Sequence, residues 1–137
     1  MPSSLKFVLA VLVLGFLIVP PSIWIQHHET HKHAQVLAAW ATGGDPGRGQ
    51  AAIQRLGCGA CHQMGTVQGT SGQVGPALND LSSRAEFAGK VANEPQSLIA
   101  WIQQPQKISP GVGMPDIPMS DQDARDMAAY LYALRGP

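Results

Sequence analysis

The sequence predicts an all-α protein with long loops, in which one N-terminal transmembrane helix precedes a small domain. Three observations support this fold class. An apolar segment of membrane-spanning length lies near the N-terminus, apolar residues further on recur at the three-to-four spacing of helices, and no stretch alternates as a strand does. The 15 glycines and 11 prolines indicate many turns and irregular segments between the helices.

Length and composition argue against several classes of protein. A chain of 137 residues has room for one domain of ordinary size. Hydrophobic residues make up 45% of the chain, and nine basic residues balance nine acidic ones. This composition argues against intrinsic disorder and against nucleic-acid binding through a basic patch. Two cysteines are too few for a disulfide scaffold.

The segment Leu5–Ile25 is apolar except for one lysine and one serine. As a helix it would rise roughly 31 Å, close to the thickness of the hydrocarbon core of a bilayer. A cleaved signal peptide is the alternative, because the uninterrupted apolar run Phe7–Val19 is short and follows a single lysine. No small-x-small cleavage site directly follows that run, and Trp24 stands where an interfacial aromatic anchor belongs. We therefore predict a retained signal-anchor over residues 1–26.

A histidine-rich stretch follows the anchor and begins a linker over residues 27–44. Imidazoles are common metal ligands, so a metal site is one interpretation. However, no cysteine or second carboxylate completes a set of four ligands, and we favour a polar collar at the lipid headgroups. The clustered histidines are His27, His28, His31 and His33.

The remaining domain, residues 45–137, contains three predicted helices. The first runs from Pro46 to about Leu56, with Asp45 as its N-cap. The second spans 95–105 between two prolines. The last begins after Ser120, which opens a sequence similar to a capping box. Glycine-rich and proline-rich loops separate these helices.

The sequence Cys58-Gly59-Ala60-Cys61-His62 is the pattern of covalent haem attachment. Two cysteines three residues apart on a helical turn face the same side, so both thiols can reach the two vinyl groups of one porphyrin edge. His62 follows directly and projects toward the iron as an axial ligand. We therefore predict one covalently attached haem c, with Cys58, Cys61 and His62 holding the ring and its iron.

Two other chemistries use cysteine pairs, and neither fits this chain. Thioredoxin-type redox chemistry shares the cysteine spacing, but it needs a strand–helix–strand context that the pattern lacks, and it does not require the following histidine. A structural zinc site needs four ligands of the Cys or His kind, and the chain has no second cysteine pair.

The second axial ligand separates electron transfer from catalysis at an open iron. We choose Met114, because flanking glycines let the backbone approach the ring and a following proline stiffens the exit. Met119 lies in a similarly irregular stretch and is the alternative. Met127 falls on the apolar stripe of the last helix, which predicts core packing, and Met64 is too near His62 to reach the far side.

Residues Asp45 to Leu134, about two thirds of the chain, resemble a class I c-type cytochrome domain. The resemblance implies that the first and last helices cross at Gly49 and at Tyr130 or Leu131. It also implies that the carbonyl of Pro76 accepts a hydrogen bond from the other ring nitrogen of the axial histidine. It rests on Gly49, Cys58 to His62, Gly75-Pro76-Ala77-Leu78, the Trp101 helix, Gly111 to Pro115 and the terminal helix with Tyr130.

The same resemblance assigns three further residues to the haem pocket. Leu78 resembles a residue that packs on the haem face. Trp101 resembles an aromatic that lines the pocket or donates to a propionate, with plain core packing as the alternative. Arg84 resembles a basic residue near the propionates of oxidase-linked domains, with a solvated arginine as the alternative. The chain departs from mitochondrial soluble carriers in lacking their ring of lysines, which argues against long-range steering toward a strongly acidic partner.

These features predict an electron carrier and not an enzyme, because an iron bound by His62 and Met114 has no open position and the chain shows no nucleophile motif or paired carboxylates. The resemblance places the haem domain on the periplasmic face of a bacterial inner membrane. We expect electrons to pass from a quinol-oxidising complex to a haem-copper oxidase, without nucleic acid or a small-molecule substrate. A fixed haem relay subunit of a larger respiratory or photosynthetic complex is the alternative, and a sensor or peroxidase with open iron is the third.

Overall fold

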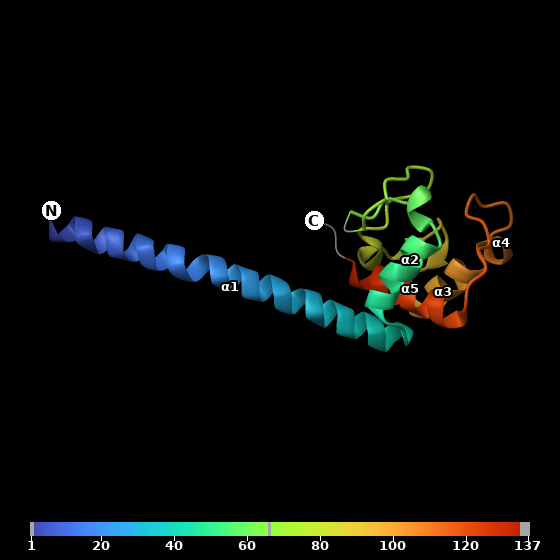
Figure 1. The fold of residues 1–137 in the computed structure, drawn as a ribbon, viewed down its shortest axis with the longest axis horizontal. Helices are drawn as coiled ribbons and strands as arrows, with labels where there is room; N and C mark the ends of the chain where they lie inside the picture. The colour runs from blue at the N-terminus through green and yellow to red at the C-terminus, as the bar shows by residue number, and fades with distance from the viewer. Residues whose placement is uncertain (1, 66, 135–137) are drawn as a thin grey trace. The chain divides into compact units, whose positions relative to one another are not determined.

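The computed structural model describes residues 2–65 and 67–134, apart from the side chain of His27. Residues 135–137 of the predicted haem domain lie outside this description. Helices dominate the chain, which confirms the predicted all-α class (Figure 1). The chain divides into two compact units, Met1–His33 and Ala34–Pro137.

The first unit consists of most of helix α1, which spans Ser3–Thr42 and includes Pro20 and Pro21. This helix is long and apolar enough to cross a membrane, with a mean hydropathy of 2.5 over its most apolar window. Its large apolar side chains in the first unit are exposed, as lipid-facing side chains are. The same helix continues through most of the predicted linker, and Ala34, Ala38 and Thr42 are buried in the second unit.

The histidine-rich stretch is helical and makes local contacts. The Trp24 and His28 rings stack with their centroids 5.4 Å apart, and Lys32 Nζ lies 3.5 Å from Glu29 Oε1. Among the described residues, no group of three or more His, Cys, Asp or Glu could hold a metal ion. The polar collar stays a prediction.

Side-chain caps start two of the helices where the sequence places them. Helix α2 (Pro46–Arg55) begins after Asp45, whose side chain accepts a hydrogen bond from the amide of Arg48 at 2.8 Å. Helix α5 (Asp121–Ala133) begins with a complete capping box between Ser120 and Asp123. Both predicted helix starts are confirmed.

The remaining helices are short. Helix α3 (Pro95–Gln103) ends before Pro105, and that proline opens one further turn, α4 (Pro105–Ile108). Proline suits a first helical position, because the amide it lacks would have no partner inside the helix. Two single turns of 3-10 helix, η1 (Cys58–Ala60) and η2 (Leu81–Ser83), interrupt the loops.

A small antiparallel hairpin lies between η2 and α3, and the sequence did not predict it. Its strands, β1 (Glu86–Phe87) and β2 (Val91–Ala92), have two residues each. Strands this short cannot show an alternating pattern, because a period needs more than one repeat. Phe87 anchors the hairpin by packing its ring edge-on against Trp101, with the ring centroids 5.8 Å apart.

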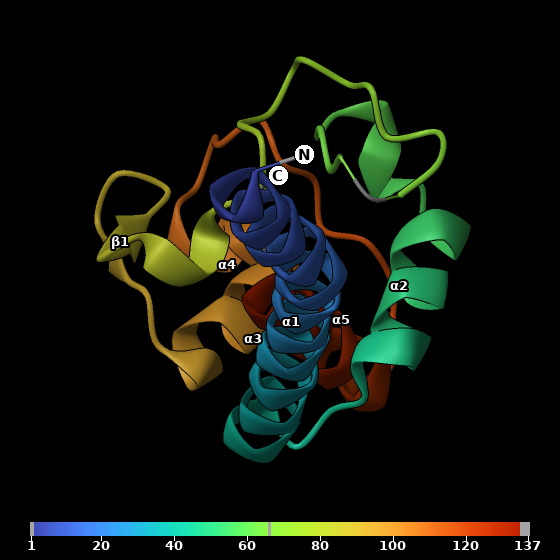
Figure 2. The same cartoon turned by 90° about the vertical axis from the view of Figure 1, so that its left-hand side faces the viewer.

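The core of the second unit forms where α2 and α3 pack against α5 (Figures 1 and 2). At the crossing of α2 with α5, a Cβ built on Gly49 would lie 2.0 Å from the carbonyl oxygen of Asp126 and 2.8 Å from Cβ of Tyr130. No side chain fits in this gap, so the backbones meet closely at Gly49. The crossing implied by the resemblance is therefore present. The core residues of α5 are Ala124, Met127, Ala128, Tyr130 and Leu131, and the C-cap residue Leu134 joins them.

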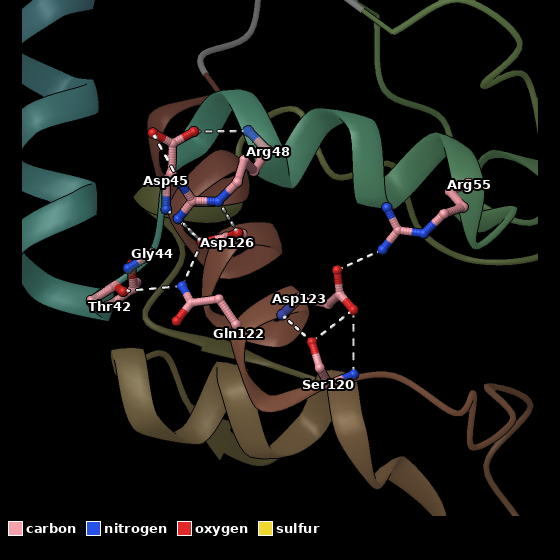
Figure 3. A network of polar contacts seen from close by, with 10 residues as sticks. Thr42, Gly44, Asp45, Arg48, Arg55, Ser120, Gln122, Asp123 and Asp126 are labelled. Carbon is pink, nitrogen blue, oxygen red and sulfur yellow. Dashed lines mark hydrogen bonds and ion pairs between the residues drawn. The ribbon is translucent and has the colours of Figure 1, made fainter.

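Charged pairs fix the same crossing from its edge (Figure 3). The Asp126 carboxylate is buried and accepts hydrogen bonds from Arg48 Nε at 2.7 Å, from the Asp45 amide at 2.7 Å and from Gln122 at 2.8 Å. Arg55 pairs with Asp123 further along α2. Asp123 and Asp126 of α5 thus face α2, and both are paired with its arginines.

We expect Gly49→Ala to destabilise the domain by about 1–3 kcal/mol, the usual range for overpacking a core. The added methyl group would displace the backbone of α5 at Asp126. Gly47→Ala is the matched control on α2, because a Cβ there meets only the side-chain oxygen of Asp45, at 3.2 Å. Denaturant unfolding of the holoprotein measures both changes. Equal loss in the two variants would contradict the close crossing.

The lowered pKa of Asp126 predicts that the folded domain loses part of its stability in acid. Burial alone would raise the pKa of this carboxyl, but the hydrogen bonds from Arg48, the Asp45 amide and Gln122 together lower it below its ordinary value. A lowered folded-state pKa contributes stability that is present above the unfolded value of about 3.9 and is lost as the pH falls through the folded value.

We therefore expect Asp126→Asn to lower the stability at pH 7 by about 1–3 kcal/mol. The difference from the wild-type protein should shrink as the pH falls below about 4, because the unfolded wild-type carboxyl becomes neutral there and the folded one follows at its lower pKa. Thermal unfolding followed by circular dichroism from pH 7 to pH 3 measures this difference, with the exposed Asp80→Asn as control. A difference that stays constant down to pH 3 would show that the Asp126 charge does not carry the effect.

Candidate haem site

The two cysteines lie on one tight turn directly after α2. Cys58 opens η1 and is half-buried, and Cys61 follows its end and is exposed. The carbonyl of Cys58 accepts hydrogen bonds from the amides of Cys61 at 3.3 Å and His62 at 3.0 Å. This short turn therefore brings both thiols and the imidazole together within five consecutive residues.

The imidazole of His62 has a fixed tautomer. Its Nδ1 lies 2.8 Å from the carbonyl oxygen of Pro76. A carbonyl can only accept, so Nδ1 is the nitrogen that donates, and in the neutral form of the ring Nε2 then has the lone pair that a metal needs. The hydrogen bond to Pro76 that the resemblance implied is present. Such a bond makes Nε2 a stronger electron-pair donor to a metal.

The loop after the cysteines folds back onto η1 and holds the imidazole in place. The Gly75 amide donates to the carbonyl of Cys61 at 2.8 Å, and the Leu78 amide donates to that of Gln63 at 3.0 Å. A Cβ built on Gly75 would lie 2.4 Å from Cε1 of His62. Only glycine therefore permits this approach of the loop backbone to the imidazole.

Thr70 ties the centre of this loop together, and sequence reasoning missed it. Its buried hydroxyl lies 2.5 Å from the carbonyl oxygen of Met64 and 2.6 Å from that of Val67. It also accepts from the Met64 amide at 3.3 Å. A threonine among glycines carries no sequence signal for this role, because the contacts depend on how the loop closes.

Met114 lies half-buried in the loop after α4, and Gln106 holds that loop. The side-chain amide of Gln106 donates to the carbonyls of Val112 and Met114, both at 2.6 Å, and its oxygen accepts from the Gly111 amide at 3.1 Å. Sequence reasoning also missed Gln106. One glutamine thus fixes the backbone on both sides of Gly113.

The other described methionines differ in burial. Met64 and Met127 are buried in the core, which confirms the predicted core position of Met127. Met119, the alternative ligand, is partly buried and packs against the core, as Met114 does.

The remaining residues assigned to the pocket lie around these loops. Leu78 is half-buried and packs against the core. Trp101 is buried and contacts Phe87, as its core-packing alternative expects. Arg84 donates through Nη2 to the carbonyl of Ala77 at 2.6 Å, which leaves its other N–H groups available.

The site fits a haem in its donors and in its lining. Two thiols, one neutral imidazole and a thioether are the groups that hold a c-type haem. The half-buried apolar side chains of Leu78, Val112 and Met114 border the core and offer apolar surface to a porphyrin. Burial raises the pKa of the Cys58 thiol, which argues against a reactive thiolate pair.

The family model for cytochrome c matches residues 47–135. The chain belongs to the cytochrome c family. It is also similar to cytochrome c oxidase subunit 2 of Alkalihalophilus pseudofirmus, with 35% identity over 89 residues, or 64% of this chain. The chain spans only 25% of the length of that relative.

Membership of the cytochrome c family settles the cofactor. The domain binds haem c covalently, with its iron, and Cys58 and Cys61 lie together where the attachment motif belongs. Cytochromes c carry electrons, so electron transport is the chemistry of this site. The predicted family and cofactor are confirmed, and the ligand roles of individual residues stay predictions.

We expect Gly75→Ala in the holoprotein to push the imidazole of His62 away from Pro76. The new methyl group would overlap the imidazole, so ligation should weaken and part of the ferric iron should become high-spin. Gly65→Ala is the matched control in the same loop, because a Cβ there comes no closer than 3.7 Å to the Asn79 side chain. Electron paramagnetic resonance measures the spin state. A low-spin spectrum in both variants would contradict the tight contact.

Proposed function

We propose that this chain is a membrane-tethered monohaem cytochrome c that passes single electrons on the periplasmic face of a bacterial inner membrane. The observation that carries the proposal is the succession of one membrane-length apolar helix and one cytochrome c domain within a single chain. We propose a quinol-oxidising complex as donor and a haem-copper terminal oxidase as acceptor. The similarity to an oxidase subunit supports the acceptor.

In this proposal, Cys58 and Cys61 would hold the haem through thioether bonds, and His62 and Met114 would bind its iron. When bound, the haem supplies a one-electron change of its iron between the ferrous and ferric states. His62 is held by Pro76, and the Met114 loop is held by Gln106. Ligands fixed in this way need little rearrangement when the iron charge changes, which suits rapid electron transfer.

The surrounding residues have supporting roles in the proposal. Leu78 packs on the haem face, and Trp101 closes the pocket from the core side. Arg84 offers its free N–H groups to a propionate, while its bond to Ala77 holds the guanidinium in place.

A second candidate function is a fixed haem relay within a larger respiratory complex. It is favoured by the relative, in which the matching region is a quarter of a subunit of an oxidase. Purification of the full chain in mild detergent separates the two candidates. We expect the carrier to elute without stoichiometric partners, whereas constant partner subunits would favour the relay and contradict the free carrier.

The axial ligand is tested with Met114→Ala. Loss of the thioether should lower the reduction potential by on the order of 0.1–0.3 V, within the range of about 0.8 V that axial ligands span. The opened ferrous iron should also bind carbon monoxide. Met119→Ala is the matched control and should change neither property. Redox titration and carbon monoxide difference spectra measure both, and the reverse result would identify Met119 as the ligand.

A further inference from the structure

The loop that carries Met114 has little regular structure of its own. It runs from the end of α4 to the start of α5 and stands at the edge of the second unit (Figure 1). Among the described residues, 110–119 make one backbone–backbone hydrogen bond, in which the Val112 amide donates to the Ser109 carbonyl at 3.2 Å. Backbone groups without such partners need side chains or water instead. The conformation of this loop therefore depends on side chains that bind its backbone.

Gln106 supplies three such bonds to the loop. Its Nε2 donates to the carbonyls of Val112 and Met114, and its Oε1 accepts from the Gly111 amide. A carbonyl only accepts and a backbone amide only donates, so these partners decide which end of the side-chain amide faces each of them. An ionised carboxylate of the same length would keep the acceptor and lose both donors. The loop thus uses both halves of the Gln106 amide.

Asp116 closes the same loop at its two ends. Its Oδ1 accepts from the backbone amide of Gln106 at 3.1 Å. Gln106 is the second residue of α4, so this amide has no partner inside the helix. Asp116 comes two residues after Met114. The bond therefore joins the start of the loop to its end, and it holds the residue whose side chain reaches the Met114 carbonyl.

Packing holds the loop less firmly than these bonds do. The side chains of Val112, Met114 and Met119 pack against the core, but each is only partly buried. Partial burial removes less apolar area from water and so stabilises less than full burial. Gln106 and Asp116 therefore provide a large part of what keeps the loop closed.

We propose that Gln106 and Asp116 form a loop clamp that sets how often the Met114 sulfur leaves the iron, and that the clamp thereby keeps small external ligands off the iron. This inference rests on the proposed function, in which Met114 binds the iron. Both are positioning residues, because they bind the backbone of the loop on either side of the ligand. The clamp adds to the proposed carrier a reason why its iron stays closed.

The first test follows imidazole binding to the ferric full-length holoprotein in neutral detergent at pH 7 by stopped-flow absorbance. Imidazole binds only after the sulfur has left, so the rate constant at saturating imidazole measures loop opening. Gln106→Glu should raise it about tenfold or more, since tenfold corresponds to about 1.4 kcal/mol, the upper end of one net hydrogen bond.

Gln104→Glu is the matched control, because it adds the same charge two residues away. Gln104 is exposed and makes no side-chain hydrogen bond that caps α4. Its rate constant should stay within about twofold of the wild-type value, as for an ordinary surface substitution. An equal rise in both variants, or none in Gln106→Glu, would overturn the clamp.

The second test separates the hydrogen bond of Asp116 from its charge. Asp116→Ala removes the acceptor and should raise the same rate constant about fivefold, as expected for one net hydrogen bond. Asp116→Asn keeps an oxygen that can accept from the Gln106 amide, so it should restore a rate constant within about twofold of the wild-type value. Equal rates in the two variants would overturn the part of Asp116 in the clamp.

A third variant distinguishes the clamp from a general loss of stability. Asp126→Asn weakens the α2–α5 crossing, which is remote from the clamp in the sequence, and should leave imidazole binding within about twofold of the wild-type rate. Denaturant unfolding of every variant gives its global stability. If the imidazole rate constants follow global stability across all variants, the loop opens only with the whole domain and the clamp is overturned.

Met114→Ala tells failure of the clamp from failure of the proposed ligand. Without the sulfur, imidazole should bind without a preceding opening step, so the rate should rise linearly with imidazole concentration and not saturate. A rate that still saturates would overturn Met114 as the ligand, and the clamp with it. Linear binding in Met114→Ala together with a wild-type rate in Gln106→Glu would overturn the clamp alone.

Discussion

The hydrogen bond between His62 and the Pro76 carbonyl is the contact on which the rest of the site depends. It fixes the imidazole tautomer, and it exists because the loop after the cysteines folds back onto η1. That folding needs glycine at position 75, where the loop backbone touches the imidazole. The same path leaves Val74 exposed.

The helical frame supports this loop through a crossing of α2 and α5 at which small residues meet. Helix α5 contributes buried alanines to the core. On α2, Gly49 lies at the close approach to α5, and Ala52 is buried. Small side chains let helices approach closely but bury little apolar area each. A ligand held only by the folded state adds to the stability of that state. The hydrogen bonds that the buried Asp126 accepts from Arg48 and from the Asp45 amide help to fix the orientation of α2 against α5.

Features set by neighbouring residues could be predicted from the sequence, and features set by chain closure could not. Asp45 and Ser120 cap helices through bonds within three residues, and the cysteine motif is equally local. Thr70 and Gln106 act through carbonyls that reach them only when a glycine-rich loop closes, and no pattern marks such residues. The β1–β2 hairpin is too short for a period, and the pairing of Arg48 with Asp126 joins residues 78 positions apart.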